Sequence, residues 1–381
     1  MRILIAHSFY RIGGGEDRYV RRQVALLASD HQVDLLERRN IDVPNTVGAA
    51  ARMTYSTTAI EDAEQQIDAF KPDVVHVHNI YPGLGPAIHI AAQKRGVPLV
   101  MTVHNYRLRC PNGYMFTEGQ LCQRCQSGNH LNAVIHRCFP SKTQSVSYAT
   151  ALWLHRFVLR LEKKVALFIA PSNFMSRRLV SWGIDESRTR AIPNFVDPIP
   201  DASAGVGGYG LFVGRLSAEK GVDNLLRALK QAGDPPFRIA GEGPLAESLL
   251  SSAAQLGLEN TTFLGLQTAE QVTALMRGAR FLALPSISEE SSGLAAIEAM
   301  AAGRPLLVSD RGGLPELIAD GTGVSWAAGD EPGLARHIGS LMTDDSLCRE
   351  MGTRSLHAAT TRYSADTHLA ALEDAYRDAV A

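Results

Sequence analysis

Short apolar runs alternate with amphipathic segments along the whole chain, and this alternation restricts the fold more than any other feature. Each run has the length of a buried strand, and the segment after it has helical spacing. Repeated strand–helix units of this kind form parallel sheets. The runs in the first half are Arg2–Ala6, Asp73–Val77, Pro98–Val103 and Val165–Ala170.

A second series of apolar runs follows a stretch rich in Pro, Gly, Ala and Ser that begins at Pro193. A chain of 381 residues exceeds what one α/β domain usually needs. One large doubly wound sheet is the alternative, but a new strand–Gly–helix start after the stretch favours two Rossmann-like domains facing a central cleft, over residues 1–198 and 199–362. The second series comprises Gly210–Val213, Phe237–Ala240, Thr261–Leu264, Ala279–Leu284 and Pro305–Ser309.

The composition argues against several classes of partner and location. A formal net charge of −1 gives no electrostatic reason to expect nucleic acid. The apolar stretch at the N-terminus is too short for a signal-peptide core, and no run approaches the roughly 18 apolar residues of a membrane span. We therefore expect a cytoplasmic protein. Peripheral contact at the inner face of the membrane stays open, because residues 153–168 are amphipathic at first and fit either a membrane surface or a helix packed beside the cleft.

The longest motif follows the run that ends at Leu284 and reads PSISEESSGLAAIEAMAAGRP. A helix is expected to begin near Ser292 or Gly293, which leaves Glu290 in the loop and places Glu298 about a turn and a half into the helix. One carboxylate can then address a sugar hydroxyl and the other a ribose diol. The amides of Ser291, Ser292, Gly293 and Leu294 lie between them, where unpaired N–H groups and the helix dipole favour a diphosphate.

On these residues the chain resembles the retaining glycosyltransferases of the GT-B fold, in particular family 4, which share the pattern Glu, seven residues, Glu. The resemblance implies that residues 363–381 form a helix that packs back on the first domain. Where the family usually has Gly-Phe-Gly after the first Glu, this chain has Ser291-Ser292-Gly293. That departure puts the shape of the sugar pocket in doubt.

The segment GRLSAEKG, residues 214–221, follows the first strand of the second domain. Arg215 and Lys220 are suited to meet two phosphates, Arg through its planar fork and Lys as a point charge. A helix-capping segment with two solvated cations is the alternative reading. Together with the Glu pair, the segment matches the diphosphate clamp of the family.

Three further positions gain a role only from the resemblance. It implies that Gly241, Glu242 and Gly243, ahead of Pro244 at an early helical position, form a turn near the nucleotide. It also implies that Gly14 and Gly15 approach the donor phosphate, although a flexible turn fits them too. His104 stands at the carboxyl end of a strand, where the family has a His near the sugar and the reaction centre, so we expect it to be catalytic beside Glu290, Arg215 and Lys220.

Four of the five cysteines, Cys110, Cys122, Cys125 and Cys138, are clustered, and we expect no secretory signal because the N-terminal apolar stretch is short. This arrangement favours metal binding or free thiols over disulfides. A C-x2-C pair flanked by single cysteines can form a tetrahedral zinc site in an insertion over residues 105–145. Reduced thiols are the alternative. Four thiolates would leave no open position, so such a zinc ion would be structural.

The resemblance implies that a sugar moves from a UDP- or GDP-sugar to an acceptor hydroxyl with retention, and that no cofactor or metal is needed for catalysis. The acceptor could be a glycan, a lipid-linked saccharide or a small metabolite. A sugar-nucleotide epimerase, a phosphorylase and a non-catalytic nucleotide-sugar-binding protein are the alternatives. A nicotinamide-dependent oxidoreductase is disfavoured, because Gly13–Gly15 lack the G-x-G-x-x-G spacing.

Overall fold

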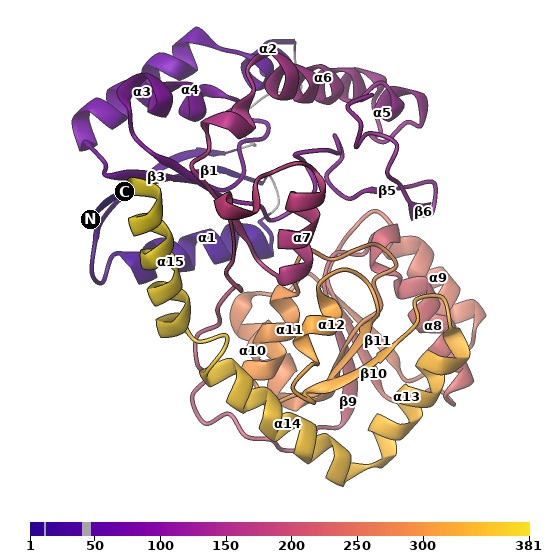
Figure 1. Cartoon of the computed structure of the whole chain (residues 1–381). Coiled ribbons are helices and arrows are strands. Elements are labelled where there is room, and N and C mark those ends of the chain that lie inside the picture. The colour runs from indigo at the N-terminus through magenta and orange to yellow at the C-terminus, as the bar shows by residue number, and fades with distance from the viewer. Residues whose placement is uncertain (11–12, 40–46) are drawn as a thin grey trace. The chain divides into compact units, whose positions relative to one another are not determined.

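A computed structural model describes residues 1–10, 13–39 and 47–381 of the chain (Figure 1). Its internal contacts divide it into two compact units. The N-terminal unit comprises Met1–Glu118, Cys122–Pro193 and His368–Ala381, and the C-terminal unit comprises Gly119–Leu121 and Asn194–Thr367. Each unit contains one parallel sheet of six strands, which confirms the predicted α/β class with two Rossmann-like sheets.

The sheet of the N-terminal unit has the strand order β2-β1-β3-β4-β7-β8. The four predicted strands are confirmed, and two edge strands were missed. β2 (QVDLLERR) carries charge at nearly every second position because it lies half-buried at an edge, and β8 has only three residues. The strands are β1 (Arg2–Phe9), β2 (Gln32–Arg39), β3 (Val74–Val77), β4 (Leu99–Thr102), β7 (Leu167–Ala170) and β8 (Thr189–Ala191).

Within the described ranges, seven helices of at least eight residues accompany this sheet. They are α1 (Gly15–Leu27), α2 (Val47–Thr54), α3 (Thr57–Phe70), α4 (Ala87–Arg95), α6 (Lys142–Trp153), α7 (Asn173–Ser181) and α15 (Ala365–Val380). The connection between β4 and β7 also holds β5 (Phe116–Thr117), β6 (Gln120–Leu121), α5 (Asn132–Ile135), a π-helical turn (Leu154–Val158) and a 3-10 turn (Leu161–Lys164).

Both faces of this sheet are buried. One face contributes Leu4, Val75 and Phe168 to the core. The opposite face is also largely apolar but includes His76, whose Nδ1 lies 2.7 Å from the hydroxyl of Tyr376 in α15 and whose Nε2 lies 2.7 Å from Thr102 Oγ1. A polar contact thus joins this face of the sheet to the C-terminal helix.

The sheet of the C-terminal unit has the strand order β11-β10-β9-β12-β13-β14. The five predicted strands are confirmed, and the edge strand β14 was missed. The strands are β9 (Tyr209–Val213), β10 (Phe237–Ala240), β11 (Thr261–Gly265), β12 (Ala279–Leu284), β13 (Leu306–Ser309) and β14 (Gly323–Trp326). The helices are α8 (Val222–Gln231), α9 (Ala246–Gln255), α10 (Ala269–Gly278), α11 (Leu294–Ala301), α12 (Leu314–Leu317), α13 (Glu331–Thr343) and α14 (Asp345–Thr360).

Both faces of this second sheet are apolar, because side chains alternate along each strand. Phe212 and Phe281 belong to one core cluster, which α8, α9 and α13 complete. Their neighbours Leu211 and Leu282 belong to another cluster with α10, α11 and α14. Burial on both faces explains why these strands read as continuous apolar runs in the sequence.

None of the described helices combines the length and the apolar character that crossing a bilayer requires.

Candidate functional site

The order of the strands in the C-terminal unit reverses between β9 and β12, and the carboxyl ends of these two strands are here named the β9/β12 crevice. The chain runs outward from β9 through β10 to β11, and then returns to the other side of β9 with β12. In open parallel sheets, ligands bind at the carboxyl ends of the strands where the order reverses in this way. The two strongest sequence motifs, residues 214–221 and 285–305, directly follow β9 and β12.

An ion pair joins these two loops. Lys220 Nζ lies 2.6 Å from Glu290 Oε1, and both side chains are partly exposed. The same carboxylate oxygen accepts a hydrogen bond of 2.5 Å from Ser286 Oγ. The structure therefore brings one of the predicted cations and one of the predicted carboxylates into direct contact.

The backbone also ties the two loops together. The carbonyl of Glu219 accepts hydrogen bonds from the amides of Ile287 and Ser288, at 3.0 and 3.2 Å. Gly221 has a φ of +66°, and a Cβ added there would lie 2.1 Å from the carbonyl oxygen of Pro285. Only glycine allows the backbone at position 221 to come this close to the Pro285 carbonyl. This close contact holds Lys220 beside the loop that follows β12.

A third loop, after β13, supports Glu290 from its backbone side. The amide of Gly313 donates to the Glu290 carbonyl at 2.7 Å, and Glu290 forms an isolated parallel bridge with Gly312. Gly312 has a φ of +65°, and an added Cβ would lie 2.2 Å from the Glu290 carbonyl oxygen. Glu290 is therefore positioned by its own backbone as well as by its side-chain partners.

The helix after Glu290 begins where the sequence predicts. Gly293 is the N-cap of α11 and Leu294 its first residue, so Glu298 lies on the second turn and is half-buried. Ser291 is half-buried in the loop, and Ser292 Oγ accepts a hydrogen bond of 2.8 Å from Asn194 Nδ2.

Gly293 has a φ of −141°, so a positive φ is not the reason for glycine at this N-cap. An added Cβ would lie 2.8 Å from Leu317 Cδ1 of α12. Close packing against α12 therefore accounts for this residue.

The turn after β10 packs against the loop after β9. The amide of Leu216 donates to the Glu242 carbonyl at 2.9 Å, and a Cβ on Gly243 would lie 2.3 Å from the Leu216 carbonyl oxygen. Gly241 has a φ of +145°. Helix α9 begins only at Ala246, so the prediction that Pro244 occupies an early helical position is wrong.

Sequence reasoning missed the part that Glu219 plays in this arrangement. Its carboxylate is buried and accepts a hydrogen bond of 2.5 Å from Ser217 Oγ. Arg215, two positions before Ser217, is exposed. A charged residue next to Lys220 gives no sequence signal of burial, because Glu is rarely buried unless it is paired.

The N-terminal unit has its own reversal of strand order, between β1 and β3. Gly14 is the N-cap of α1 and Gly15 its first residue, and both follow β1 after the undescribed residues 11–12. A Cβ added to Gly14 meets nothing within 4 Å, and its φ is −121°. The fold itself therefore does not require glycine at position 14.

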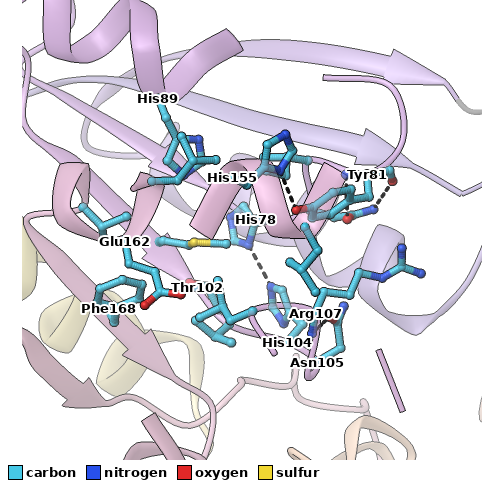
Figure 2. A pocket seen from close by; sticks show the side chains of 18 of the residues that line it. His78, Tyr81, His89, Thr102, His104, Asn105, Arg107, His155, Glu162 and Phe168 are labelled. Atoms are coloured by element: carbon cyan, nitrogen blue, oxygen red, sulfur yellow. Dashed lines mark hydrogen bonds between the residues drawn. The ribbon is translucent and has the colours of Figure 1, made fainter. Parts of the chain in front are cut away.

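His104, predicted as a catalytic residue, lies beyond the end of β4. Its Nε2 is 2.8 Å from Nδ1 of His78, and the two rings stack (Figure 2). Burial, and then the neighbouring His7, lowers the pKa of His104 to about 3. The imidazole is therefore neutral near pH 7 and can exchange hydrogen bonds without carrying a charge.

A pocket opens beside this histidine pair within the N-terminal unit (Figure 2). Apolar side chains such as Met101 and Phe168 form much of its wall, and the polar ones include Glu16, Tyr81, His104, Arg107 and His155. Figure 2 shows the contact of 2.7 Å between the Tyr81 hydroxyl and His155 Nδ1.

Four side-chain atoms of the residues that line this pocket are buried without a hydrogen-bond partner in the described ranges. Two of them are His78 Nε2 and His89 Nδ1, and the other two belong to charged residues. Glu16 Oε1 and Arg107 Nη1 are buried and find no hydrogen-bond partner among the residues that the structure describes. Burial raises the pKa of Glu16, whose other carboxylate oxygen accepts a hydrogen bond of 3.0 Å from the Tyr10 hydroxyl. Buried polar groups are nearly always paired, so these two atoms mark a place for a polar ligand. Sequence reasoning missed both residues, because no spacing connects position 16 with position 107.

The four clustered cysteines line one small pocket in the connection between β4 and β7. All four are free thiols. Burial and the nearby Cys110 raise the pKa of Cys125 to about 12. As placed, no three His, Cys, Asp or Glu side chains within the described ranges form a group that could hold a metal ion. Zinc binding would therefore require the thiols to turn toward one another.

Comparisons with known proteins place both units in one family. The model described as Glycosyltransferase Family 4 matches residues 13–199, and the model described as Glycosyl transferases group 1 matches residues 208–357. The chain is 35% identical to D-inositol 3-phosphate glycosyltransferase of Nocardia farcinica over 211 residues, 48% of this chain and 47% of that relative. It is 30% identical to glycogen synthase of Mycobacterium tuberculosis over 309 residues, 78% of this chain and 66% of that relative.

The chain thus spans about half the length of the first of these relatives. Its fold is similar to that of HepE from Anabaena, solved in complex with UDP-glucose, with a TM-score of 0.69 and 19% identity over 98% of this chain and 99% of that one. With two parallel sheets and matches to both family models, the chain belongs to the family 4 glycosyltransferases of the GT-B fold.

Proposed function

We propose that the protein is a retaining glycosyltransferase that moves a sugar from a UDP- or GDP-sugar to an acceptor hydroxyl, without a metal ion in catalysis. The observation that carries the proposal is the contact of 2.6 Å between Lys220 and Glu290 at the β9/β12 crevice. In this proposal, Lys220 is the cation that binds the diphosphate and Glu290, in contact with it, is the carboxylate that binds the sugar. Arg215 supplies a second cation from the same loop.

The helix after this crevice completes the proposed donor site. Ser291–Leu294 surround the N-terminus of α11, where backbone N–H groups and the helix dipole favour a diphosphate. Glu298 follows on the second turn, where its carboxylate would accept hydrogen bonds from the ribose diol. The turn with Gly241, Glu242 and Gly243 packs on the Arg215 loop and would flank the nucleotide. Both UDP and GDP contain this ribose, so the site admits either.

The proposed reaction depends on stabilising the leaving group. The acceptor oxygen bonds to the anomeric carbon while the bond from that carbon to the diphosphate oxygen breaks, and the electron pair stays on the diphosphate. Arg215 and Lys220 stabilise the developing charge, a preorganised electrostatic role. A donor phosphate oxygen takes the proton of the acceptor hydroxyl. No covalent enzyme intermediate is needed, and the sugar keeps its anomeric configuration.

The pocket of the N-terminal unit is the proposed acceptor site. It offers apolar walls together with Glu16 and Arg107, each of which has a polar atom available to a ligand. His104 at its edge is proposed to contact the sugar and the reaction centre, and Gly14 and Gly15 the donor phosphate. The names of the relatives support an acceptor rich in hydroxyl groups, such as an inositol phosphate or a glucan. A lipid-linked saccharide fits the same pocket chemistry.

One experiment tests the reaction class. The purified protein is incubated with UDP- and GDP-sugars, with and without a panel of glycan, inositol and lipid-linked acceptors, in the presence of a metal chelator. Release of nucleoside diphosphate that rises with one acceptor, and a product with the anomeric configuration of the donor by NMR, are expected. Isomerised donor without acceptor would indicate an epimerase instead. Consumption of glucan with phosphate would indicate a phosphorylase, and binding without turnover a nucleotide-sugar-binding protein.

We also propose that Cys110, Cys122, Cys125 and Cys138 hold a structural zinc ion. The support is that all four thiols line one pocket and that none is in a disulfide. Four cysteines satisfy the tetrahedral preference of zinc, so the ion would fold the connection around itself and take no part in the transfer.

A further inference from the structure

Exposed apolar side chains concentrate in one part of the N-terminal unit. Leu131 and Ile135 are 66% and 68% exposed, and Trp153 is 50% exposed. These belong to a set that we call the apolar patch, which lies on α5, α6 and the π-helical turn. Its six members are Leu131, Ile135, Val146, Trp153, Phe157 and Val158.

The spacing of these residues puts them on the outward side of their helices. The inward side of α6 is formed by Ser145, Ala149 and Leu152, which are buried. Val146 and Trp153 are seven residues apart and so share one side of α6, about a quarter turn away from the inward side, and Phe157 follows one turn later. The Trp153 and Phe157 rings have centroids 6.3 Å apart.

The two helices that carry the patch are joined to each other. α5 and α6 pack side by side (Figure 1). Arg156 Nη1 donates to the carbonyl of Gln126, 2.9 Å away, just before α5. Phe157 covers Gly128 so closely that an added Cβ would lie 2.3 Å from its Cζ. The patch is therefore continuous from Trp153 and Phe157 toward α5.

The segment of the chain that carries the apolar patch has a positive net charge. Residues 122–164 contain seven lysines and arginines and a single acidic residue, Glu162, which gives a formal charge of +6 against −1 for the whole chain. The carboxylate of Glu162 is already bound by the buried Arg109. The exposed members of the basic set are Arg124, Arg137, Lys142, Arg160 and Lys163.

We propose that this surface binds the headgroup region of an anionic lipid bilayer. Exposed apolar side chains that include a Trp, in a segment rich in exposed Lys and Arg, fit the pattern of a helix lying in the membrane interface. The anionic headgroups complement the charge of +6, and each nearby basic side chain strengthens binding in low salt. A polar protein surface would leave the six apolar side chains without a matching partner. The inference goes beyond the proposed transfer activity and stands without it.

The test uses the full chain and vesicles of two compositions, phosphatidylcholine alone and phosphatidylcholine with phosphatidylglycerol. The protein is expected to sediment with the anionic vesicles, to be released by high salt, and to stay in solution with the neutral ones. Trp153→Ser/Phe157→Ser is expected to weaken binding by about tenfold or more. The matched control is Leu250→Ser/Leu266→Ser, which removes two exposed apolar side chains, 50% and 59% exposed, from the C-terminal unit and leaves binding unchanged.

Tryptophan emission gives a second readout. Trp153 is exposed, whereas Trp182 is half-buried and Trp326 is buried. Anionic vesicles are expected to shift the emission to shorter wavelength in the wild type and not in Trp153→Phe. Equal unfolding temperatures for wild type and variants show that the fold is intact. No sedimentation with either vesicle set would overturn the proposal. So would a wild-type dimer that Trp153→Ser/Phe157→Ser converts to monomer without any vesicle binding.

Discussion

The ammonium group of Lys220 and the carboxylate of Glu290 are in contact although seventy positions separate them in the chain. The contact exists because β9 and β12 are neighbours in the sheet, so the loops that follow them meet at the same edge. The sequence leaves two interpretations of the loop that carries Lys220. It either binds phosphate or caps a helix while its cations are solvated. The position of Lys220 beside Glu290 favours the reading as a phosphate ligand.

Removal of either partner is expected to impair transfer more than folding. Lys220→Ala removes the charge that we propose stabilises the leaving group, and a fall in kcat/KM of about 100-fold or more is expected. Glu290→Gln keeps the shape of the side chain but removes its negative charge. This change is expected to slow transfer by about tenfold or more. Release of nucleoside diphosphate measures both, and Lys230→Ala, at an exposed position of α8, is the control. Unchanged rates in both variants would remove the proposed roles.

The sheets could be predicted from the sequence because their central strands are buried on both faces. Nine apolar runs become strands, and Glu290, Gly293 and Glu298 lie where the spacing of the long motif puts them. Edge strands escaped detection, since β2 carries charges and β8 has three residues. The pocket residues Glu16 and Arg107 escaped because their proximity depends on the path of the chain, which no local pattern encodes.

Acid is expected to destabilise the protein through its buried histidines. Burial lowers the pKa of His89 to about 3, against about 6.5 in an unfolded chain. The unfolded state therefore binds a proton first, and the free energy of unfolding falls as the pH drops from about 6.5 toward about 3. His76 and His104 behave alike, since burial lowers the pKa of each to about 3. Each adds up to about 1.4 kcal/mol per pH unit.

A single substitution can show this effect. His89 Nδ1 is buried without a hydrogen-bond partner in the described part of the chain, so His89→Leu loses no bond at that atom. Urea unfolding between about pH 7 and pH 5 is expected to give a slope that is lower by up to about 1.4 kcal/mol per pH unit than in the wild type. An unchanged slope would show that His89 is not buried in its neutral form.

Glu16 offers a test of the acceptor pocket. Glu16→Gln keeps the size of the side chain but removes the negative charge that Arg107 and an acceptor would share. The KM for the acceptor is expected to rise by about tenfold, while release of nucleoside diphosphate without acceptor stays unchanged. Glu61→Gln, at an exposed position of α3, is the matched control. A change confined to the donor KM would place the acceptor elsewhere.

Zinc content decides between the two readings of the cysteine cluster. Protein purified from zinc-containing medium is expected to hold about one zinc ion per chain by mass spectrometry of the metal. Cys125→Ser is expected to lose the ion and to lower the unfolding temperature. Cys348→Ser alters a buried cysteine of α14 outside the cluster and is expected to keep the ion. Zinc-free wild-type protein that takes up no added zinc would favour reduced thiols.

The most direct test of the central claim compares a nucleoside with its diphosphate by isothermal titration calorimetry. The wild type is expected to bind UDP or GDP more tightly than uridine or guanosine, because Arg215 and Lys220 are proposed to contact the two phosphates. In Arg215→Ala/Lys220→Ala this advantage is expected to shrink by about 100-fold or more, while the affinity for the nucleoside stays the same. A double variant that still prefers the diphosphate as strongly as the wild type would contradict the assignment.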